Sequence, residues 1–175
     1  EFVLVPVRSK SRNSRLVDVI KGINPFLAVI FCNTRKTAEH VAGYLAEQGI
    51  RAGQIHGDLS PRDRKKMMKH IRELEFQYIV ATDLAARGID IQGISHVINY
   101  EIPEDLEFFI HRVGRTARAG NKGTAITLYQ PEDEDALARI EKMGIPFEQK
   151  DVKNGEWTEL KDRHQRASRK GERKE

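Results

Sequence analysis

Residues 26–32 read Phe-Leu-Ala-Val-Ile-Phe-Cys, and this stretch decides the fold together with the helical pattern behind it. These residues are apolar without alternation, which is typical of a strand buried on both faces of a sheet. From Ala38 to Leu45, apolar side chains then recur at i, i+3, i+4 and i+7, the spacing of an amphipathic helix, which ends near Gly49. A buried strand followed by such a helix predicts one strand–helix unit of a parallel sheet.

The same alternation of apolar runs and helical patterns extends in both directions from this unit. We predict strands at residues 2–7, 52–55, 78–81, 96–100 and 124–129, and helices at residues 16–22, 60–74, 104–113 and 131–143. This order predicts an α/β domain with a mostly parallel β-sheet, helices on both faces and right-handed crossovers. The periodicity fades from about Lys153, so we place the domain at residues 1–152 and a basic, flexible C-terminal extension at residues 153–175.

The chain has 175 residues, which is enough to bury the core of one domain without disulfides or a structural metal. No apolar run approaches the roughly 18 residues that a membrane-spanning helix needs, so we expect no membrane partner. The single cysteine, Cys32, cannot form an internal disulfide, which favours a reducing, cytoplasmic compartment. The chain begins with Glu1 and Phe2, without Met or a signal segment, and this start predicts a piece of a longer protein.

The positive charge of the chain is concentrated at its C-terminal end. The whole chain has 30 Lys and Arg against 26 Asp and Glu, whereas residues 161–175 alone hold seven against three. The first 160 residues are therefore balanced, with 23 charges of each sign. A basic tail favours a polyanionic partner such as RNA, but a solvated, frayed terminus has the same composition.

Three polar segments follow strands of the predicted sheet, and a fourth stands in a predicted helix and its end. They are residues 33–35, 56–58, 82–90 and 111–120. Because ligands bind outside the carboxyl ends of the strands in open parallel sheets, we expect the functional site there. In the last segment Arg112, Arg115 and Arg118 are spaced by three, so one side of a helical turn would present three guanidinium groups to one anion.

Several common catalytic and binding motifs are missing from the sequence. There is no G-x-x-x-x-G-K-[ST] segment, so the chain has no P-loop, and there is no G-x-S-x-G elbow of a serine hydrolase. The six histidines are scattered and Cys32 has no ligand-spaced partner, so we predict no metal site. The acids at residues 133–135 follow Pro131 at a predicted helix start, where we expect them to cap the helix.

Together, these segments resemble the C-terminal RecA-like domain of DEAD-box ATP-dependent RNA helicases. The resemblance covers residues 2–150, and its strongest marks are residues 56–58, residues 81–90 and residues 111–118, in that order. Each mark alone is weakly specific, whereas the ordered set is highly specific. The opening His111 also favours this family, because related helicase families more often have Gln at that position. The resemblance implies a RecA-like three-layer sandwich.

The resemblance assigns residues to an ATP site. Arg115 and Arg118 match positions that reach across a cleft between two domains to the γ-phosphate of ATP, with Arg118 as the arginine finger. Gly88 and Asp90 match positions that border the nucleotide, with Asp90 near the ribose. We therefore expect ATP as the ligand, bound together with Mg²⁺.

The resemblance also implies a second domain that this sequence does not contain. An N-terminal RecA-like domain of the same protein is expected to hold the P-loop, the catalytic acids and the Mg²⁺ ion. His111 and Arg112 match positions that link the two domains and couple ATP to RNA. Arg112 and Arg87 also have a structural explanation, namely pairing with surface acids.

For RNA, the resemblance implies contacts with the sugar-phosphate backbone. The matching positions are Thr34, Arg35, Gly57, Arg64 and Thr82. Hydroxyls, backbone amides and an arginine can hold phosphates without reading bases. The sequence departs from the family pattern at Pro61, where the family usually has Gln, so we expect the interaction of that Gln side chain to be missing.

The sequence supports two hypotheses of function. In the first, the chain is the second motor domain of an ATP-dependent RNA helicase, inactive alone, that unwinds short RNA duplexes together with the N-terminal domain. Other RNA-processing proteins are then possible partners. In the second, it is a non-catalytic RNA- or protein-docking module that uses its basic tail. Trp157 lies beyond the last predicted strand and either stacks on bases or pins the tail to the domain.

Overall fold

The computed structural model describes residues 1–8, 10–57, 59–87, 91–115 and 123–160 of the chain. The strands are β1 (Phe2–Pro6), β2 (Ala28–Cys32), β3 (Ala52–Ile55), β4 (Tyr78–Thr82), β5 (His96–Asn99), β6 (Thr124–Tyr129), β7 (Glu148–Lys153) and β8 (Glu156–Glu159). The helices are α1 (Arg12–Lys21), α2 (Arg35–Glu47), α3 (Pro61–Arg72), α4 (Asp83–Ala86), α5 (Leu106–Gly114) and α6 (Glu134–Lys142), and a 3₁₀ turn precedes α6 at Pro131–Asp133.

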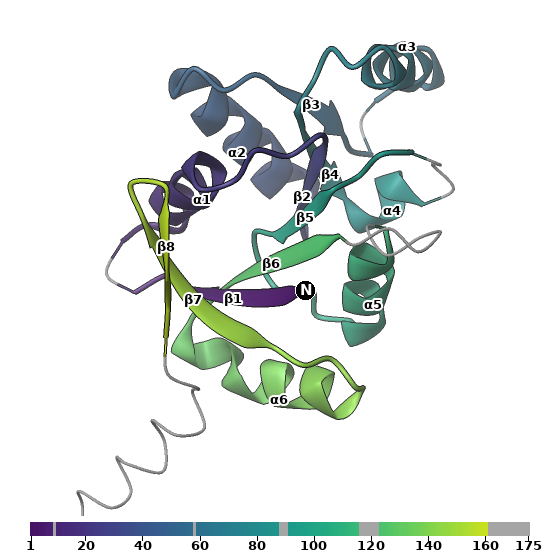
Figure 1. The fold of residues 1–175 in the computed structure, drawn as a ribbon. Coiled ribbons are helices and arrows are strands. Elements are labelled where there is room, and N and C mark those ends of the chain that lie inside the picture. The colour runs from purple at the N-terminus through teal and green to yellow at the C-terminus, as the bar shows by residue number, and fades with distance from the viewer. Residues whose placement is uncertain (9, 58, 88–90, 116–122, 161–175) are drawn as a thin grey trace, which may run out of the picture.

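The eight strands form one sheet in the order β3-β4-β2-β5-β6-β1-β7-β8. Neighbouring strands from β3 to β7 in this order pair in parallel, and β7 and β8 pair antiparallel. Helices α1 and α2 pack on one face, whereas α3, α4, α5 and α6 pack on the other (Figure 1). The predicted α/β sandwich with helices on both faces is therefore confirmed. Among the described helices, none is long and apolar enough to cross a membrane.

The central strand β2 explains why its sequence has no alternation. Ala28, Ile30 and Cys32 belong to the hydrophobic cluster under α1 and α2. Val29 and Phe31 belong to the cluster under α3 and α4. All five side chains are at most 3% exposed. Because both faces of β2 are covered, every position of the strand takes an apolar residue.

Helix starts follow the polar residues that cap them. Asp133 accepts a hydrogen bond from the N–H of Gln130 at 2.8 Å, so the predicted capping role is confirmed for the first acid of residues 133–135. At α5, the carboxylate of Asp105 accepts the N–H of Glu107 at 3.0 Å. This cap starts the helix at Leu106, two residues later than predicted.

The β7–β8 hairpin is absent from the sequence prediction. Its buried positions include the polar side chains Gln149 and Asp151, so β7 shows no apolar alternation. The domain boundary predicted after residue 152 falls inside this hairpin, and residues 153–160 belong to the domain. Residues 161–175, the rest of the predicted extension, lie outside the described residues.

Trp157 on β8 pins the hairpin to the end of α1. Its indole Nε1 donates a hydrogen bond to the carbonyl oxygen of Gly22 at 2.6 Å, and its ring packs against the core under α1 and α2. A β-carbon at residue 22 would lie 2.7 Å from the indole nitrogen, so this approach requires glycine. Of the two interpretations of Trp157, the structure favours pinning.

A buried ion pair also joins α1 to β7. Arg15 is 2% exposed, contacts the carboxylate of Asp151 and donates to the carbonyl oxygens of Pro6 and Val152 at 3.0 Å each. Burial acts to raise the pKa of Asp151. Hydrogen bonds from Arg15 and the Val152 N–H, with the charges of Arg15 and Arg8, outweigh that effect and hold this pKa below its ordinary value. The carboxylate is therefore charged when it stabilises the fold.

We expect Asp151→Asn to lower the free energy of unfolding at neutral pH by about 2–3 kcal/mol. A buried cation left alone costs about 3–5 kcal/mol, and here Asp18 still contacts Arg15 at 3.1 Å. Because the folded pKa of Asp151 is depressed, its contribution is present above about pH 4 and is lost as the pH falls further. Urea unfolding of the wild-type chain and of the Asp151→Asn variant at about pH 7 and pH 3 measures this difference in the free energy of unfolding. Equal urea midpoints at neutral pH would contradict it.

Candidate functional site

The carboxyl ends of β2, β4 and β5 meet at Arg112 of α5, which is 1% exposed. Its Nε and Nη2 each lie 2.6 Å from a carboxylate oxygen of Asp83, the residue after β4. Nη2 also donates to Asn33 Oδ1 at 2.8 Å, and Nη1 donates to the carbonyl oxygen of Glu101 at 2.8 Å. One guanidinium group therefore ties three strand ends to α5.

All five N–H groups of Arg112 are used inside the domain. The last Nη1 hydrogen faces Asn99 Oδ1 at 3.5 Å, and the guanidinium carbon lies 5.3 Å from the ring centroid of Phe31. The prediction that three arginines converge on one anion is therefore wrong for Arg112, which has no donor left for a phosphate. Any part that Arg112 takes in coupling must act through the residues it positions.

Cys32 lies at the end of β2 beside this network and is fully buried. Burial, together with the negative charges of Glu101 and Asp83 and only partly offset by Arg112, raises the pKa of the Cys32 thiol to about 12. Because the thiolate is the reactive form, this thiol is inert at neutral pH. Cys32 is a packing residue, as its buried strand position indicates.

His111 and Arg115 lie on the accessible side of the same helix. His111 is exposed, and Arg115 follows the last residue of α5 and donates through Nη2 to the carbonyl oxygen of Ala86 at 3.1 Å. Both line a small cavity of about 20 Å³ together with Arg87 and Phe108. The guanidinium carbon of Arg87 lies 5.7 Å from the Phe108 ring centroid. Two cations, Arg87 and Arg115, thus border the surface between α4 and α5.

Three residues predicted to border the nucleotide lie outside the described residues: Gly88, Asp90 and Arg118. Gly88 follows Arg87 directly in the sequence, and Arg118 stands three positions beyond Arg115. Their contacts with ATP stay predictions.

Four of the five residues predicted to contact RNA line one groove. This groove has a volume of about 500 Å³ and lies where β2, β3 and β4 end and α5 begins. The four residues are Thr34, Arg35, Gly57 and Thr82. The structure therefore brings together residues from three strand–helix units, as the strand-end argument predicts.

The polar groups of this groove differ in the contacts that they already make within the domain. Within the described part of the chain, the hydroxyl of Thr82 has no hydrogen-bond partner, and it caps no N–H of α4. In contrast, Thr34 Oγ1 accepts the N–H of Thr37 at 3.2 Å and caps α2. Arg35 Nε lies 3.8 Å from Glu39 one turn along α2. Thr82 therefore offers a free hydroxyl, while Thr34 also has a structural role.

Arg64, the fifth predicted residue, stands on α3 and is not among the residues that line this groove. Its Nη2 donates to the carbonyl oxygen of Arg87 at 3.3 Å, which ties the first turn of α3 to the segment after α4. Pro61, where the family usually has Gln, is the first residue of α3. A proline fits that position because the N–H it lacks would have no partner inside the helix.

Sequence reasoning missed the acceptors that hold Arg112. Asn33 and Asp83 each follow a buried strand, and Asn99 ends β5 with no exposed area. The side chain of Asn99 also donates to Thr127 Oγ1 at 3.0 Å. An amide inside an apolar run is a signal that could have been used, because a buried amide needs a buried polar partner.

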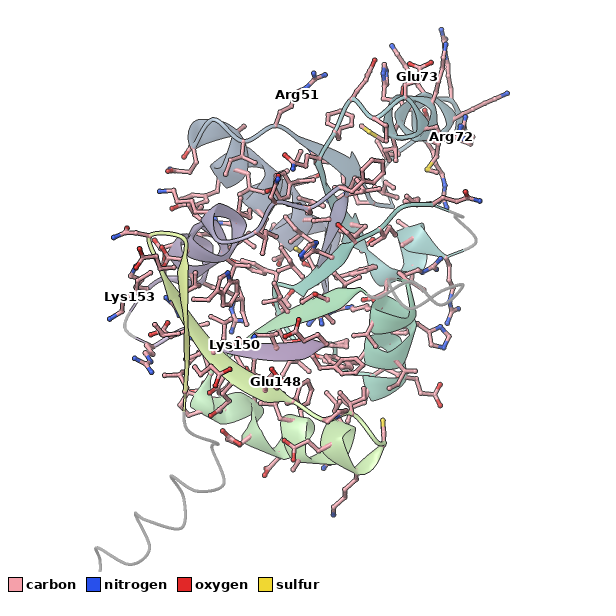
Figure 2. All side chains as sticks on the ribbon, in the orientation of Figure 1. Arg51, Arg72, Glu73, Glu148, Lys150 and Lys153 are labelled. Atoms are coloured by element: carbon pink, nitrogen blue, oxygen red, sulfur yellow. The ribbon has the colours of Figure 1, made fainter. Side chains whose placement is uncertain are left out.

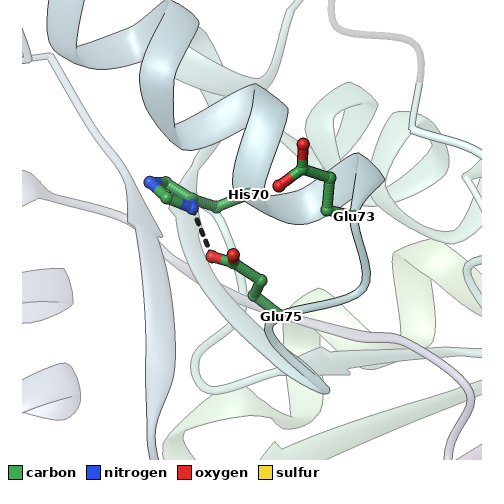
Figure 3. Close-up of side chains that lie close together, drawn as sticks. All are labelled: His70, Glu73 and Glu75. Carbon is green, nitrogen blue, oxygen red and sulfur yellow. Dashed lines mark ion pairs between the residues drawn. The ribbon is translucent and has the colours of Figure 1, made fainter.

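One cluster of possible metal ligands lies at the end of α3, away from this site (Figure 3). One ligand atom from each of His70, Glu73 and Glu75 lies within 4.8 Å of the others. Nδ1 of His70 already contacts a carboxylate oxygen of Glu75. Lys69 and Arg72 flank the cluster in sequence and oppose the binding of a cation. We interpret it as an ion pair and assign no metal to it.

Comparison with known proteins identifies the kind of domain that carries this site. The fold is similar to that of SrmB, a DEAD-box protein of E. coli, with a TM-score of 0.75, 33% identity and coverage of 84% of this chain and 86% of that one. Dbp5 of S. cerevisiae, solved with RNA and ADP BeF3, gives a TM-score of 0.78 at 28% identity over 86% of this chain and 41% of that one. The sheet with its helices is therefore a RecA-like α/β domain.

Sequence comparison then gives the family. Residues 11–120 match the family model described as the helicase conserved C-terminal domain. The DEAD-box ATP-dependent RNA helicase CshB of Bacillus subtilis is 55% identical over 170 residues, which are 97% of this chain and 39% of that protein. The chain belongs to the helicase conserved C-terminal domain family and is a C-terminal RecA-like domain of the DEAD-box type. It spans about two fifths of the length of such curated relatives.

Proposed function

We propose that this chain is the second motor domain of an ATP-dependent RNA helicase and acts on short RNA duplexes together with an N-terminal RecA-like domain. The supporting observation is the groove, where four residues expected at the RNA backbone meet from separate strand ends. It lies next to the surface that carries His111 and Arg115. RNA and ATP would thus be handled on adjoining surfaces of one domain.

On the nucleotide side, this chain supplies cations. Arg115 and Arg118 face the γ-phosphate of ATP when the two domains close, and their guanidinium groups stabilise the charge that develops during hydrolysis. The N-terminal domain supplies the P-loop and holds Mg²⁺, which neutralises phosphate charge. His111, exposed on α5, lies at the contact between the domains.

On the RNA side, the groove holds the sugar-phosphate backbone. The free hydroxyl of Thr82, the backbone at Gly57 and the guanidinium of Arg35 are donors that suit phosphate oxygens. Such contacts grip a strand without reading its bases. When the domains close on ATP, the groove bends one strand of a duplex, and its partner strand dissociates.

The pair of Arg112 and Asp83 links the two sides. Asp83 lines both the RNA groove and the small cavity beside Arg115. Because Arg112 holds both oxygens of this carboxylate, a shift of α5 on the nucleotide side moves the wall of the RNA groove. This contact is the route by which ATP and RNA are coupled. We place the whole protein in the cytoplasm, where other RNA-processing proteins are its further partners.

The test compares the whole protein with this chain alone. We expect the whole protein to hydrolyse ATP faster in the presence of RNA and to separate a short labelled RNA duplex, and the chain alone to do neither. RNA binding by the whole protein without ATP turnover would instead support a docking module. ATP turnover by the purified chain, with contamination excluded, would contradict the proposed division of roles.

We also expect Gly57→Ala to weaken RNA binding without loss of stability. A β-carbon at Gly57 would meet no atom within 4 Å, so the domain itself does not need glycine there. A methyl group between the groove wall and the RNA backbone should lower the affinity by roughly three- to tenfold, about 1 kcal/mol. Gly43→Ala is the matched control, because Gly43 is exposed on α2 and its β-carbon would also meet nothing. Fluorescence anisotropy with labelled RNA measures both, and equal affinities would contradict a close backbone contact at Gly57.

A further inference from the structure

The outer face of α3 carries a continuous stripe of positive charge, which we call the α3 stripe. Its residues stand at i, i+3, i+4, i+7 and i+10, so they share one side of the helix. They are Arg62, Lys65, Lys66, Lys69 and Arg72, and all five are exposed. At 1.5 Å per residue the stripe covers about 15 Å of helix axis.

The charges of the α3 stripe are not neutralised locally. Among the described residues, none of the five has an ion-pair partner. Asp63 is the single acid within α3, and it stands in the first turn. Beyond the helix end, Glu75 contacts His70, and Glu73 directly follows Arg72 but forms no ion pair with the described residues (Figure 3). The stripe therefore presents most of its charge to solvent.

The like charges of the α3 stripe destabilise α3. Arg62 and Lys66, and likewise Lys65 and Lys69, are like charges four residues apart, which repel each other on a helix. Arg62 also stands in the first turn of α3, where the positive end of the helix dipole disfavours a cation, whereas Lys69 and Arg72 stand in the last turn, where the dipole favours cations. A helix selected for stability alone would carry acids between these cations. The pattern points to an anionic partner.

The α3 stripe faces away from the sheet and from Arg64. Ile71 is buried in the core under α3, and Met67 and Met68 pack against the same cluster. These apolar residues lie on the side of the helix opposite the stripe, and Arg64 lies on their side, toward Arg87. The stripe is thus a surface separate from the groove, although α3 begins only four residues after Gly57 of the groove wall.

The charge of the α3 stripe is balanced at the far end of the domain. Residues 131–159 hold nine acids against four Lys and Arg. Arg72 of α3 and Glu148 of β7 lie at opposite ends of the molecule (Figure 2). The domain is therefore electrically polarised along the sheet, and a polyanion is attracted to the α3 end.

The composition of the α3 stripe favours RNA over a protein partner. Three of its five residues are lysines, which are depleted at protein interfaces, and no aromatic or large aliphatic side chain lies within it. Protein interfaces are anchored by buried apolar or aromatic groups. Repeated cations at the spacing of one helical turn suit a row of phosphates, which needs no such anchor.

We propose that the α3 stripe is a second RNA-binding surface, which holds the sugar-phosphate backbone of an RNA segment that flanks the one in the groove. The proposal rests on the proposed function, because the groove must hold RNA for a flanking segment to reach α3. Contact is to phosphates only, so it does not depend on the base sequence. It lengthens the RNA site of the domain without new base contacts.

The test compares two triple variants of the intact chain that lose the same charge. The stripe variant is Lys65→Gln with Lys66→Gln and Lys69→Gln, and the control variant is Arg139→Gln with Lys142→Gln and Lys153→Gln, all exposed positions at the acidic end. Affinity for a labelled single-stranded RNA of about 20 nucleotides is measured from about 50 to 400 mM KCl. We expect the slope of log affinity against log salt to fall by about two units in the stripe variant, at ~0.7 for each phosphate that is no longer neutralised, and by less than half a unit in the control.

A strand of about six nucleotides, long enough only for the groove, serves as a second probe. The two variants should bind it equally. Equal slopes for both variants on the long strand would overturn the proposal, as would a long strand that the wild-type chain does not bind. Gly57→Ala distinguishes failure of this proposal from failure of the proposed function. If Gly57→Ala weakens binding of the short strand and the stripe variant has no effect, RNA binding in the groove is supported and RNA binding by the α3 stripe is rejected. Unchanged circular dichroism and melting temperature show that both variants are folded.

Discussion

In the whole protein, Arg118→Ala should lower RNA-stimulated ATP turnover by about 10³- to 10⁵-fold, the usual contribution of an arginine finger. The proposed function assigns Arg118, which stands three residues beyond Arg115 in the sequence, to the γ-phosphate. A guanidinium group there acts on charge that appears in the transition state. Its loss should therefore lower kcat while the KM for ATP stays within a few-fold.

The matched control for this experiment is Arg139→Ala, which removes an exposed arginine from α6 and should leave turnover unchanged. Arg118→Lys should recover little activity, because a lysine ammonium lacks the planar fork that binds two phosphate oxygens. Steady-state ATP hydrolysis with saturating RNA, together with separate measurements of ATP and RNA binding, decides the result. A loss of turnover below tenfold, with binding intact, would contradict the arginine-finger assignment and support the docking module.

The sequence predicts the six strands from β3 to β1 in the sheet order, and most clearly those that are covered on both faces. At β2 and β4 every residue is buried, so burial appears directly as an uninterrupted apolar run. The hairpin of β7 and β8 does not follow this relation between burial and an apolar sequence. Its buried positions include Asp151, which is held by Arg15, a residue that lies more than 130 positions away in sequence. A polar residue buried through such a distant partner has no local signal.

The candidate site, like the fold, could be predicted only in part from the sequence. Strand-end reasoning places Thr34, Gly57 and Thr82 correctly on one groove, because the carboxyl ends of parallel strands share one edge. Spacing by three does not determine whether Arg112 of α5 or Arg115, which directly follows α5, faces inward. Arg112 turns into the domain and Arg115 stays at its surface because acceptors from three strand ends meet only at Arg112. That choice depends on the assembled sheet, and the local pattern does not contain it.

Arg112→Ala should lower the free energy of unfolding of this chain by about 3–5 kcal/mol, because it leaves the carboxylate of Asp83 buried without its counter-charge. The side chain of Asp83 is only 12% exposed, and Asn33 Oδ1 and the carbonyl oxygen of Glu101 lose their donors as well. Arg87→Ala is the matched control: Arg87 is exposed on the neighbouring segment, so its loss should cost less than about 1 kcal/mol. Urea unfolding of each variant measures these costs.

A double-mutant cycle with Asp83→Ala tests whether the cost belongs to the pair. When Asp83 is already absent, removal of Arg112 no longer strands a charge, so the double variant should be more stable than the sum of the single losses predicts, by about 1–3 kcal/mol. Because Asp83 also lines the RNA groove, each single variant should weaken RNA binding even at temperatures where it is folded. A stable Arg112→Ala variant that loses only ATP turnover would contradict this account, since it would mean that Arg112 acts on the nucleotide directly rather than by holding the strand ends together.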